Sequence, residues 1–300
     1  MNQLLSREDQ AFQTTCAIYA MGNAGRSLFL SLQKNHVPVV ACFLRHPNKL
    51  QDFCQNFSAE PTPIYSELSL FVEYLQKKQT QILFLAVPDD AIEEVADLLS
   101  HQAFLPPLIL HLSGALSYDA LWPIANRSNP AQFHPLASLS GQNPIPPGTL
   151  NAICTPRPEI EKMLFQLSRQ IKLIPSLVKN GMQPLYHVAA SITGNLPVAL
   201  IAESIQLMRQ AGIDEDLARK GLAKLLRSAA ISIEKKPLAK ALTGPIARGD
   251  LATVKQHLCT LKKFEEKSQI ETIYRLLSSQ LIHLNNDAEK KTQFYELLKH

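Results

Sequence analysis

The sequence predicts an α/β fold with a mostly parallel sheet, followed by an all-α C-terminal domain. Two observations support this prediction. Up to about residue 178, short apolar runs alternate with segments of helical spacing, which is typical of βαβ units. Beyond Leu185, helical periodicity dominates to the end of the chain. We therefore expect a flexible tail over residues 1–14, an α/β domain over 15–178 and a helical domain over 179–300.

Six apolar runs are the expected strands of the sheet. They are continuous rather than alternating, as strands buried on both faces of a parallel sheet are. In chain order they read TCAIYA, VPVVACFL, QILFLAV, PLILHLS, LNAIC and IKLIPS. The expected helices between them are Ala24–Lys34, SLFVEYLQKK, DDAIEEVADLLSH and a segment around Glu159–Gln170.

The second domain is expected to contain helices and no strand. Gly212 lies where the C-terminal cap of the first of these helices would be. The segments read LPVALIAESIQLMRQAG, DEDLARKGLAKLLRSAAISIEKK, DLATVKQHLCTLKKF and SQIETIYRLLSSQLIHL.

Composition excludes several classes of protein. The net charge of +4 and the lack of a basic block argue against nucleic-acid binding. Five scattered cysteines without a C-x-x-C pair argue against a zinc ribbon or a disulfide framework. No histidine pair at metal spacing, G-x-S-x-G elbow or P-loop is present. The N-terminus lacks the apolar core of a signal peptide, and no apolar run approaches the ~20 residues of a membrane span. We expect a cytoplasmic protein without a metal or a membrane partner.

The stretch AMGNAG follows the first expected strand and opens the first helix. Gly22 and Gly25 hold the second and third positions of the G-x-G-x-x-G pattern, while Ala20 holds the first. In that pattern a pyrophosphate is bound at the helix N-terminus, here by the backbone of Gly22, Asn23, Ala24 and Gly25. We therefore predict a Rossmann-type dinucleotide site. The alternative is an ordinary strand–turn–helix.

The end of the second strand indicates which dinucleotide is bound. An NAD site has Asp or Glu there to bond the ribose 2′-hydroxyl. This chain has FLRHPNK, and Arg45 suits a 2′-phosphate. NADP is therefore favoured over NAD, with an ordinary surface arginine as the alternative.

Two further strand ends are candidate parts of the site, because ligands of open α/β sheets bind at the carboxyl ends of strands. Val87 and Pro88 are expected to border the nicotinamide half of the cofactor. For Asp89 and Asp90, which follow them, capping of the next helix is the favoured role.

Ser113 and Gly114, in HLSG, are expected to lie over the nicotinamide or the substrate. His111 in the same motif is interpreted as a buried, hydrogen-bonded histidine. His134, at another strand-like position, is a candidate contact for substrate or cofactor.

His187, Ser191 and Asn195 are spaced i, i+4, i+8 and are predicted to share one helix face. Aligned polar groups on an apolar helix need partners or face a cleft. We predict that the three are catalytic, with His187 exchanging a proton and Asn195 holding a substrate carbonyl or hydroxyl. A hydrogen-bond network between helices is the alternative, and Lys179 is an alternative proton donor.

The segment LTGPIARGD interrupts the helical sequence and is expected to be a shaped loop. Arg248 is the candidate anchor for an anionic group of the substrate, because a guanidinium binds a carboxylate or phosphate with two parallel bonds. Asp250 would orient Arg248 or cap the following helix; the cap is the stronger interpretation.

Together, AVPDDAI, HLSGAL, FHPL, YHVAASITGN and LTGPIARGD resemble a Rossmann-like family whose C-terminal half is domain of unknown function 2520. That family is similar to the 6-phosphogluconate dehydrogenase, pyrroline-5-carboxylate reductase and ketopantoate reductase group. The resemblance runs from about Cys16 to Leu261. It implies an N-terminal NADP-binding domain, a small-molecule substrate between the domains, and a homodimer formed through the helical domain.

The leading hypothesis is an NADP-dependent oxidoreductase that transfers a hydride between nicotinamide and a small carbonyl, imine or alcohol substrate. A non-catalytic NADP-binding or interaction module is the second hypothesis. The third is a helical scaffold that kept the fold and lost the cofactor.

Overall fold

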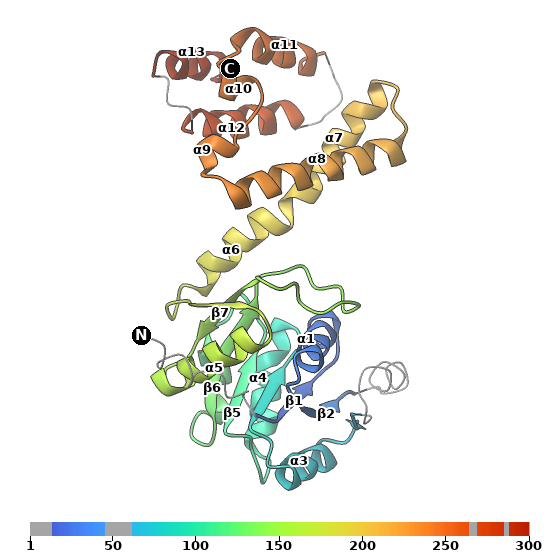
Figure 1. Cartoon of the computed structure of the whole chain (residues 1–300), viewed down its shortest axis with the longest axis vertical. Helices are drawn as coiled ribbons and strands as arrows, with labels where there is room; N and C mark the ends of the chain where they lie inside the picture. The colour runs from blue at the N-terminus through green and yellow to red at the C-terminus, as the bar shows by residue number, and fades with distance from the viewer. Residues whose placement is uncertain (1–13, 46–61, 264–268, 285–287, 300) are drawn as a thin grey trace, which may run out of the picture. The chain divides into compact units, whose positions relative to one another are not determined.

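The computed structural model describes residues 14–45, 62–263, 269–284 and 288–299. Its contacts divide the chain into two compact units, residues 1–194 and 195–300, which are described separately (Figure 1). All but the last residue of the predicted tail lies outside the described residues. Thr14 is buried.

The first unit contains a sheet of eight strands within the described part of the chain, in the order β3-β2-β1-β4-β5-β6-β7-β8. Neighbouring strands are parallel, apart from the antiparallel pair β6–β7. All six expected strands are present, and the predicted α/β fold is confirmed. The strands are β1 Cys16–Tyr19, β2 Val39–Phe43, β3 Ile64–Tyr65, β4 Ile82–Leu85, β5 Leu108–His111, β6 Asn129–Pro135, β7 Leu150–Cys154 and β8 Ile174–Leu177.

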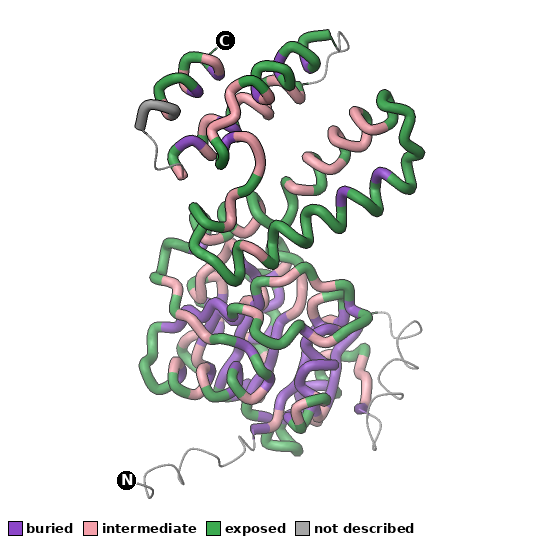
Figure 2. The backbone as a smooth tube through the Cα atoms, turned by 45° about the horizontal axis from the view of Figure 1, so that its top comes forward, coloured by how far each residue is buried: buried purple, intermediate pink, exposed green. Residues whose placement is uncertain are grey.

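Helices cover both faces of the sheet, and successive strand residues point to opposite faces. Cys16 and Ile18 pack beneath α1 (Asn23–Lys34) and α5 (Pro158–Gln170). Ala17 and Tyr19 pack on the other face, in a cluster with residues of further helices. These are α3 (Leu68–Lys77), α4 (Ile92–Ser100) and the 3₁₀ helix η3 (Tyr118–Ile124). The strands β1, β2, β4, β5, β6 and β7 are largely buried (purple in Figure 2), which explains why most of the expected strands read as continuous apolar runs. The edge strands β3 and β8 are more exposed.

Helix α6 (Gln183–Gly194) belongs to the first unit. The Nε2 of Gln183 donates to Oε1 of Gln132 at 3.3 Å, and the hydroxyl of Tyr186 bonds to His134 at 2.8 Å. The predicted domain boundary near residue 178 falls between β8 and this helix. Side-chain bonds to β6 join α6 to the sheet, and the compact unit therefore extends to residue 194.

The second unit consists of helices in its described residues. Asp214 caps α8 by accepting hydrogen bonds from the amides of Asp216 and Leu217. Gly212, with φ of +84°, ends α7 as predicted. The helices are α7 Leu196–Gln210, α8 Glu215–Lys235, α9 Leu238–Ala241, α10 Pro245–Arg248, α11 Leu251–Leu261, α12 Ile270–Ile282 and α13 Ala288–Leu298. Its small core contains Ile246, Val254, Leu258, Ile282, Phe294 and Leu298.

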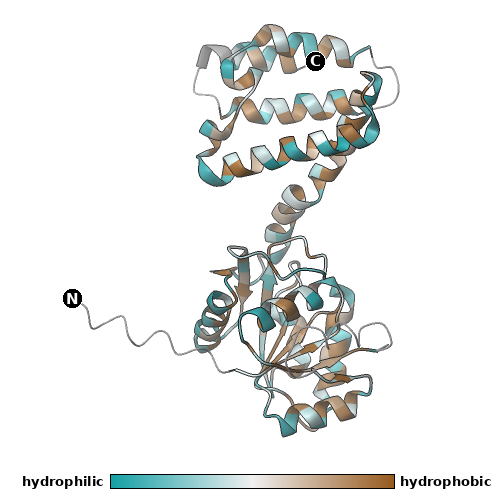
Figure 3. Ribbon diagram, turned by 45° about the vertical axis from the view of Figure 1, so that its right-hand side comes forward, coloured by the Kyte–Doolittle hydropathy of each residue, from teal (hydrophilic) through white to brown (hydrophobic). Residues whose placement is uncertain are grey.

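Residues 183–210 are largely apolar (Figure 3), and apart from Gln183 they are exposed or of intermediate burial. By length and composition this span is long and apolar enough to cross a membrane, so the expectation that no apolar run approaches that length was wrong. Asn195 and Pro197 separate α6 from α7 within it. One such helix is weak evidence and does not indicate a membrane protein.

Candidate functional site

The candidate site is built on the carboxyl ends of the parallel strands. The register pairs Tyr19 with Phe43 on one side and with Leu85 on the other, and pairs Leu85 with His111. The segments that follow β1, β2, β4 and β5 therefore leave the sheet at one edge, where ligands of open α/β sheets bind.

The turn after β1 has the shape that normally requires glycine. Ala20 has φ of +73°, in the left-handed region that L-residues with a Cβ adopt at a cost. Its amide donates to the carbonyl oxygen of Phe43 at 2.9 Å. The alanine that departs from the sequence pattern thus keeps the tight turn and carries backbone strain.

Gly25 and Gly22 have different roles in this turn. A Cβ on Gly25 would collide with the carbonyl oxygen of Ala20 and lie 3.1 Å from Cβ of Ala86, so this glycine allows helix α1 to approach the sheet. A Cβ on Gly22 would meet nothing within 4 Å. Gly22 is the N-cap of α1 and provides no side chain to cap the helix. The space beside Gly22 at the start of α1 is therefore open, which fits the approach of a pyrophosphate to this helix N-terminus.

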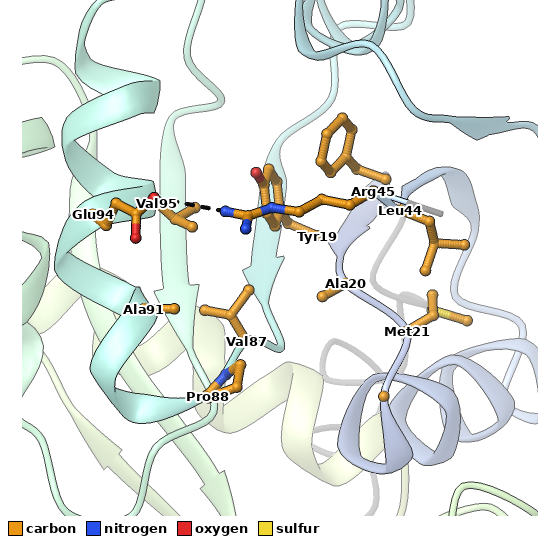
Figure 4. Close-up of a pocket in the computed structure, with 12 residues that line it drawn as sticks. Tyr19, Ala20, Met21, Leu44, Arg45, Val87, Pro88, Ala91, Glu94 and Val95 are labelled. Carbon is orange, nitrogen blue, oxygen red and sulfur yellow. Dashed lines mark ion pairs between the residues drawn. The ribbon is translucent and has the colours of Figure 1, made fainter. Parts of the chain in front are cut away.

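A pocket of about 440 Å³ lies beside this turn. Its walls come from the turn after β1, the end of β2, and the segment that joins β4 to α4 (Figure 4). Tyr19 and Phe43 both line it, and their rings stack with centroids 4.4 Å apart. Val87 and Pro88 line the same pocket as Arg45. The pocket is thus an apolar slot with a cation at one side, which suits an aromatic base attached to a phosphorylated ribose.

Arg45 crosses this pocket from the end of β2 (Figure 4). Its Nη2 atom lies 3.7 Å from Oε1 of Glu94 on α4. Burial raises the pKa of Tyr19, and the adjacent Arg45 guanidinium offsets part of that rise. The sequence reading missed Glu94, because its contact with Arg45 depends on β1 lying between β2 and β4.

Asp89 and Asp90 do not cap a helix. They form the short 3₁₀ helix η2 (Asp89–Ala91), whose N-cap residue is Pro88, and no side-chain cap bond is made there. The predicted capping was therefore wrong, because the chain turns through η2 before α4 begins.

The segment after β5 is fixed by buried hydrogen bonds. His111 is fully buried, with Nε2 2.9 Å from the carbonyl oxygen of Ser117 and Nδ1 accepting from the Ser113 amide. Its interpretation as a satisfied buried histidine is confirmed. The Ser113 hydroxyl accepts from the amides of Ala115 and Leu116, both at 3.1 Å. Ser113 thus shapes the turn that presents Gly114.

Two histidines meet over Gly114. A Cβ atom there would lie 2.8 Å from Nε2 of His134 and 2.9 Å from Nδ1 of His187. The register of β5 with β6 explains why His134 lies near Gly114. His111 pairs with Gln132, so two residues further along each strand Ser113 lies beside His134. His187 arrives from α6. The missing side chain of Gly114 therefore leaves room for both imidazoles.

Tyr186 completes this cluster, and the sequence reading did not select it. Its hydroxyl lies 2.8 Å from Nδ1 of His134, and the rings pack edge to face. Burial, with His187 nearby, lowers the pKa of His134 to about 4, and burial raises the pKa of Tyr186 to about 12. Both groups are therefore neutral at neutral pH. We assign the Tyr186 hydroxyl as donor to Nδ1, which leaves the His134 proton on Nε2, toward Gly114.

Of the other predicted residues, Ser191 is half-buried on α6 with His187. Asn195 follows the end of that helix and is the N-cap residue of α7, in the second unit. The prediction that all three residues lie on one helix was therefore wrong for Asn195, because α6 ends at Gly194. Lys179 is exposed.

Arg248 also lies in the second unit, exposed at the end of α10. Asp250 caps α11, accepting from the amide of Thr253 at 3.0 Å. The capping interpretation of Asp250 is confirmed. In the described part of the chain, no group of His, Cys, Asp or Glu side chains is suited to hold a metal.

Comparison with protein families supports the resemblance found in the sequence. Residues 151–281 match the family described as "Domain of unknown function (DUF2520)". This confirms the predicted resemblance over that part of the chain. Comparison with curated proteins gave no match.

Solved structures share the fold along nearly the whole chain. Protein TM1727 from Thermotoga maritima is 20% identical, with 95% of this chain and 100% of that chain covered and a TM-score of 0.63. A pyrroline-5-carboxylate reductase from Coxiella burnetii is 13% identical, with coverages of 96% and 95% and a TM-score of 0.60. A reductive aminase from Aspergillus terreus, in complex with NADPH and ethyl-5-oxohexanoate, is 13% identical, with coverages of 96% and 93% and a TM-score of 0.56. Identities this low establish a shared fold, and that fold is one found among NADP-dependent reductases.

Proposed function

We propose that the protein is an NADP-dependent oxidoreductase that transfers a hydride between nicotinamide and a small carbonyl, imine or alcohol substrate. The observation that carries this proposal is the turn at Ala20. Its backbone keeps the glycine-type conformation, opens directly onto the first amides of α1, and lies beside the pocket that contains Arg45.

The residues present fit the cofactor. The backbone of Gly22, Asn23, Ala24 and Gly25 would hold the pyrophosphate at the start of α1. Arg45 would bind the 2′-phosphate, because its planar fork of donors matches phosphate oxygens. Val87 and Pro88 line the pocket that contains Arg45, so they would contact the adenosine end of the nucleotide and not the nicotinamide half that the sequence predicted. The nicotinamide, when bound, supplies or accepts the hydride.

The histidine cluster would handle the proton that accompanies the hydride. Ser113 and Gly114 would form the floor beneath the reacting groups. His187 would exchange the proton with the substrate, and His134, held neutral with its proton on Nε2, would contact the substrate as a donor. Ser191, half-buried on α6, would bind a polar group of the substrate.

A titration followed by a turnover assay tests this function. Calorimetric titration with NADPH and NADH in parallel should give tighter binding of NADPH. Oxidation of NADPH, followed at its nicotinamide absorbance, should then occur with members of a carbonyl and imine panel. Binding without any turnover would favour a non-catalytic NADP-binding module. No binding of either nucleotide would overturn the proposal and favour a scaffold that has lost the cofactor.

We also propose a second copy of the chain as a partner, with no nucleic acid or membrane involved and a cytoplasmic location. Helix α7 has no buried residue within the chain although it is rich in apolar side chains. On α8, Leu217 is 64% exposed and Leu225 67%. Apolar helix surface of this extent is typical of an interface between protein chains.

A further inference from the structure

We infer that Glu94 is a second determinant of nucleotide choice in the pocket and acts against Arg45. Its carboxylate favours a ribose with a free 2′-hydroxyl and disfavours a 2′-phosphate. The inference rests on the proposed function, because it concerns the same pocket. It adds a specificity-determining residue that neither the sequence pattern nor the shared fold assigns.

The geometry places Glu94 and Arg45 at the same ligand surface. Both residues line the pocket, and Figure 4 shows the arginine side chain extended toward the carboxylate. The closest N–O distance, 3.7 Å, allows an ion pair without a tight hydrogen bond. The two side chains are 62% and 66% exposed, so a ligand can reach both. Arg45 therefore has a loosely held partner that a ligand phosphate would have to replace.

The chemistry of the two nucleotides differs at this point. A 2′-phosphate carries close to two negative charges, and binding it to Arg45 brings it near the Glu94 carboxylate. The phosphate must then compete with Glu94 for the guanidinium and tolerate like-charge repulsion. A free 2′-hydroxyl has no such cost and can donate a hydrogen bond to the carboxylate, as it does in NAD sites with an acidic residue. Glu94 thus reduces the preference for NADP that Arg45 creates.

The alternative is an ordinary surface ion pair, which contributes little to any property. Glu93 provides a matched control for this alternative. It precedes Glu94 in α4, is exposed and carries the same charge, but it does not line the pocket. A general effect of removing one negative charge from α4 would appear in both variants. A local effect on the ribose would appear only with Glu94→Gln.

Calorimetric titration of the full chain tests the inference, using NADPH, NADH, and the fragments adenosine 2′,5′-bisphosphate and AMP. Glu94→Gln should increase the affinity for NADPH and for the bisphosphate by about 3- to 10-fold, as expected for removing a negative charge a few ångströms from a phosphate. NADH and AMP should be unchanged or bound more weakly. The gain should shrink at high salt, and Glu93→Gln should change the NADPH-to-NADH affinity ratio by less than about 2-fold.

The outcomes separate the inference from the proposed function. An unchanged NADPH-to-NADH ratio in Glu94→Gln, or an equal change in Glu93→Gln, would overturn the inference while leaving the function standing. If the wild-type chain binds neither nucleotide, the proposed function fails and the inference fails with it. Thermal unfolding of both variants should match the wild type, because both positions are exposed.

Discussion

The hydroxyl of Tyr186 and Nδ1 of His134 lie 2.8 Å apart, joining helix α6 to strand β6. This bond fixes the ring of His134, whose other nitrogen points to the backbone of Gly114. One histidine is thus held neutral and oriented, while His187 approaches the same point from α6. An oriented neutral donor beside an exposed histidine suits proton exchange with a bound substrate.

The stability of the protein should depend on the state of His134. Its pKa in the folded protein is about 4, below the ordinary value of 6.5. Between these two pH values the unfolded chain binds the proton and the folded chain does not, so the free energy of unfolding should fall as pH is lowered from about 6.5 to 4. Denaturant unfolding across this pH range should show a smaller decline in the free energy of unfolding for His134→Gln than for the wild type. The exposed His101→Gln is the control, and equal slopes in all three proteins would contradict the prediction.

Gly114→Ala should abolish turnover while sparing nucleotide binding at Arg45. The added methyl would collide with the imidazoles of His134 and His187, at 2.8 and 2.9 Å, and displace both. We expect loss of activity of at least about 100-fold, in line with the misplacement of catalytic groups. Calorimetry with adenosine 2′,5′-bisphosphate should give the wild-type affinity. Normal turnover in this variant would show that the cluster takes no part in the reaction.

Ala20→Gly should stabilise the protein by about 0.5–1 kcal/mol, because glycine adopts the left-handed conformation without strain. Nucleotide binding should remain, since the turn keeps its shape. Thermal and denaturant unfolding provide the measurement. Lys172→Gly is a positive control, because Lys172 also has positive φ, +63°, and is exposed. This variant should be stabilised by a similar amount. A loss of stability in Ala20→Gly would show that the Ala20 turn is not strained.

Two glycine variants should have different effects: Gly22→Ala should weaken nucleotide binding, and Gly25→Ala should lower the stability of the fold. At Gly25 the methyl would collide with Ala20 and lower the free energy of unfolding by about 2 kcal/mol or more. At Gly22 it would meet no protein atom within 4 Å, so stability should be retained. The same methyl would occupy space needed by the proposed pyrophosphate and would weaken the binding of NADPH. Unchanged NADPH affinity in Gly22→Ala would place the pyrophosphate elsewhere.

The apolar surface of α8 should mediate pairing of two chains. Light scattering coupled to size exclusion should give a dimer for the wild type. Leu225→Glu should shift the population to monomer, because it introduces a charge at Leu225, an apolar residue that is 67% exposed in the single chain. The neighbouring Lys224→Gln, which also lowers the net charge by one, is the control for a change of charge alone. A monomeric wild type, or binding of the chain to lipid vesicles, would count against the proposed pairing.

The strands and the ends of several helices could be predicted from the sequence. Each of the six expected strands is present in the sheet, and all of them except β8, whose Ile174 and Leu177 are exposed, are largely buried. The signal is local because a strand covered on both faces needs an apolar residue at every position. Gly212 and Asp250 ended and began helices as predicted, since caps depend on neighbouring residues only.

The contacts within the candidate site were decided by the tertiary structure. Arg45 meets Glu94 because the sheet order places β1 between β2 and β4. His134 and His187 meet over Gly114 because the register of β5 with β6 and the attachment of α6 bring three distant segments together. Sequence patterns record the chemistry of single positions and their near neighbours. Strand order and register depend on packing over the whole sheet, and they determine which of those positions share a site.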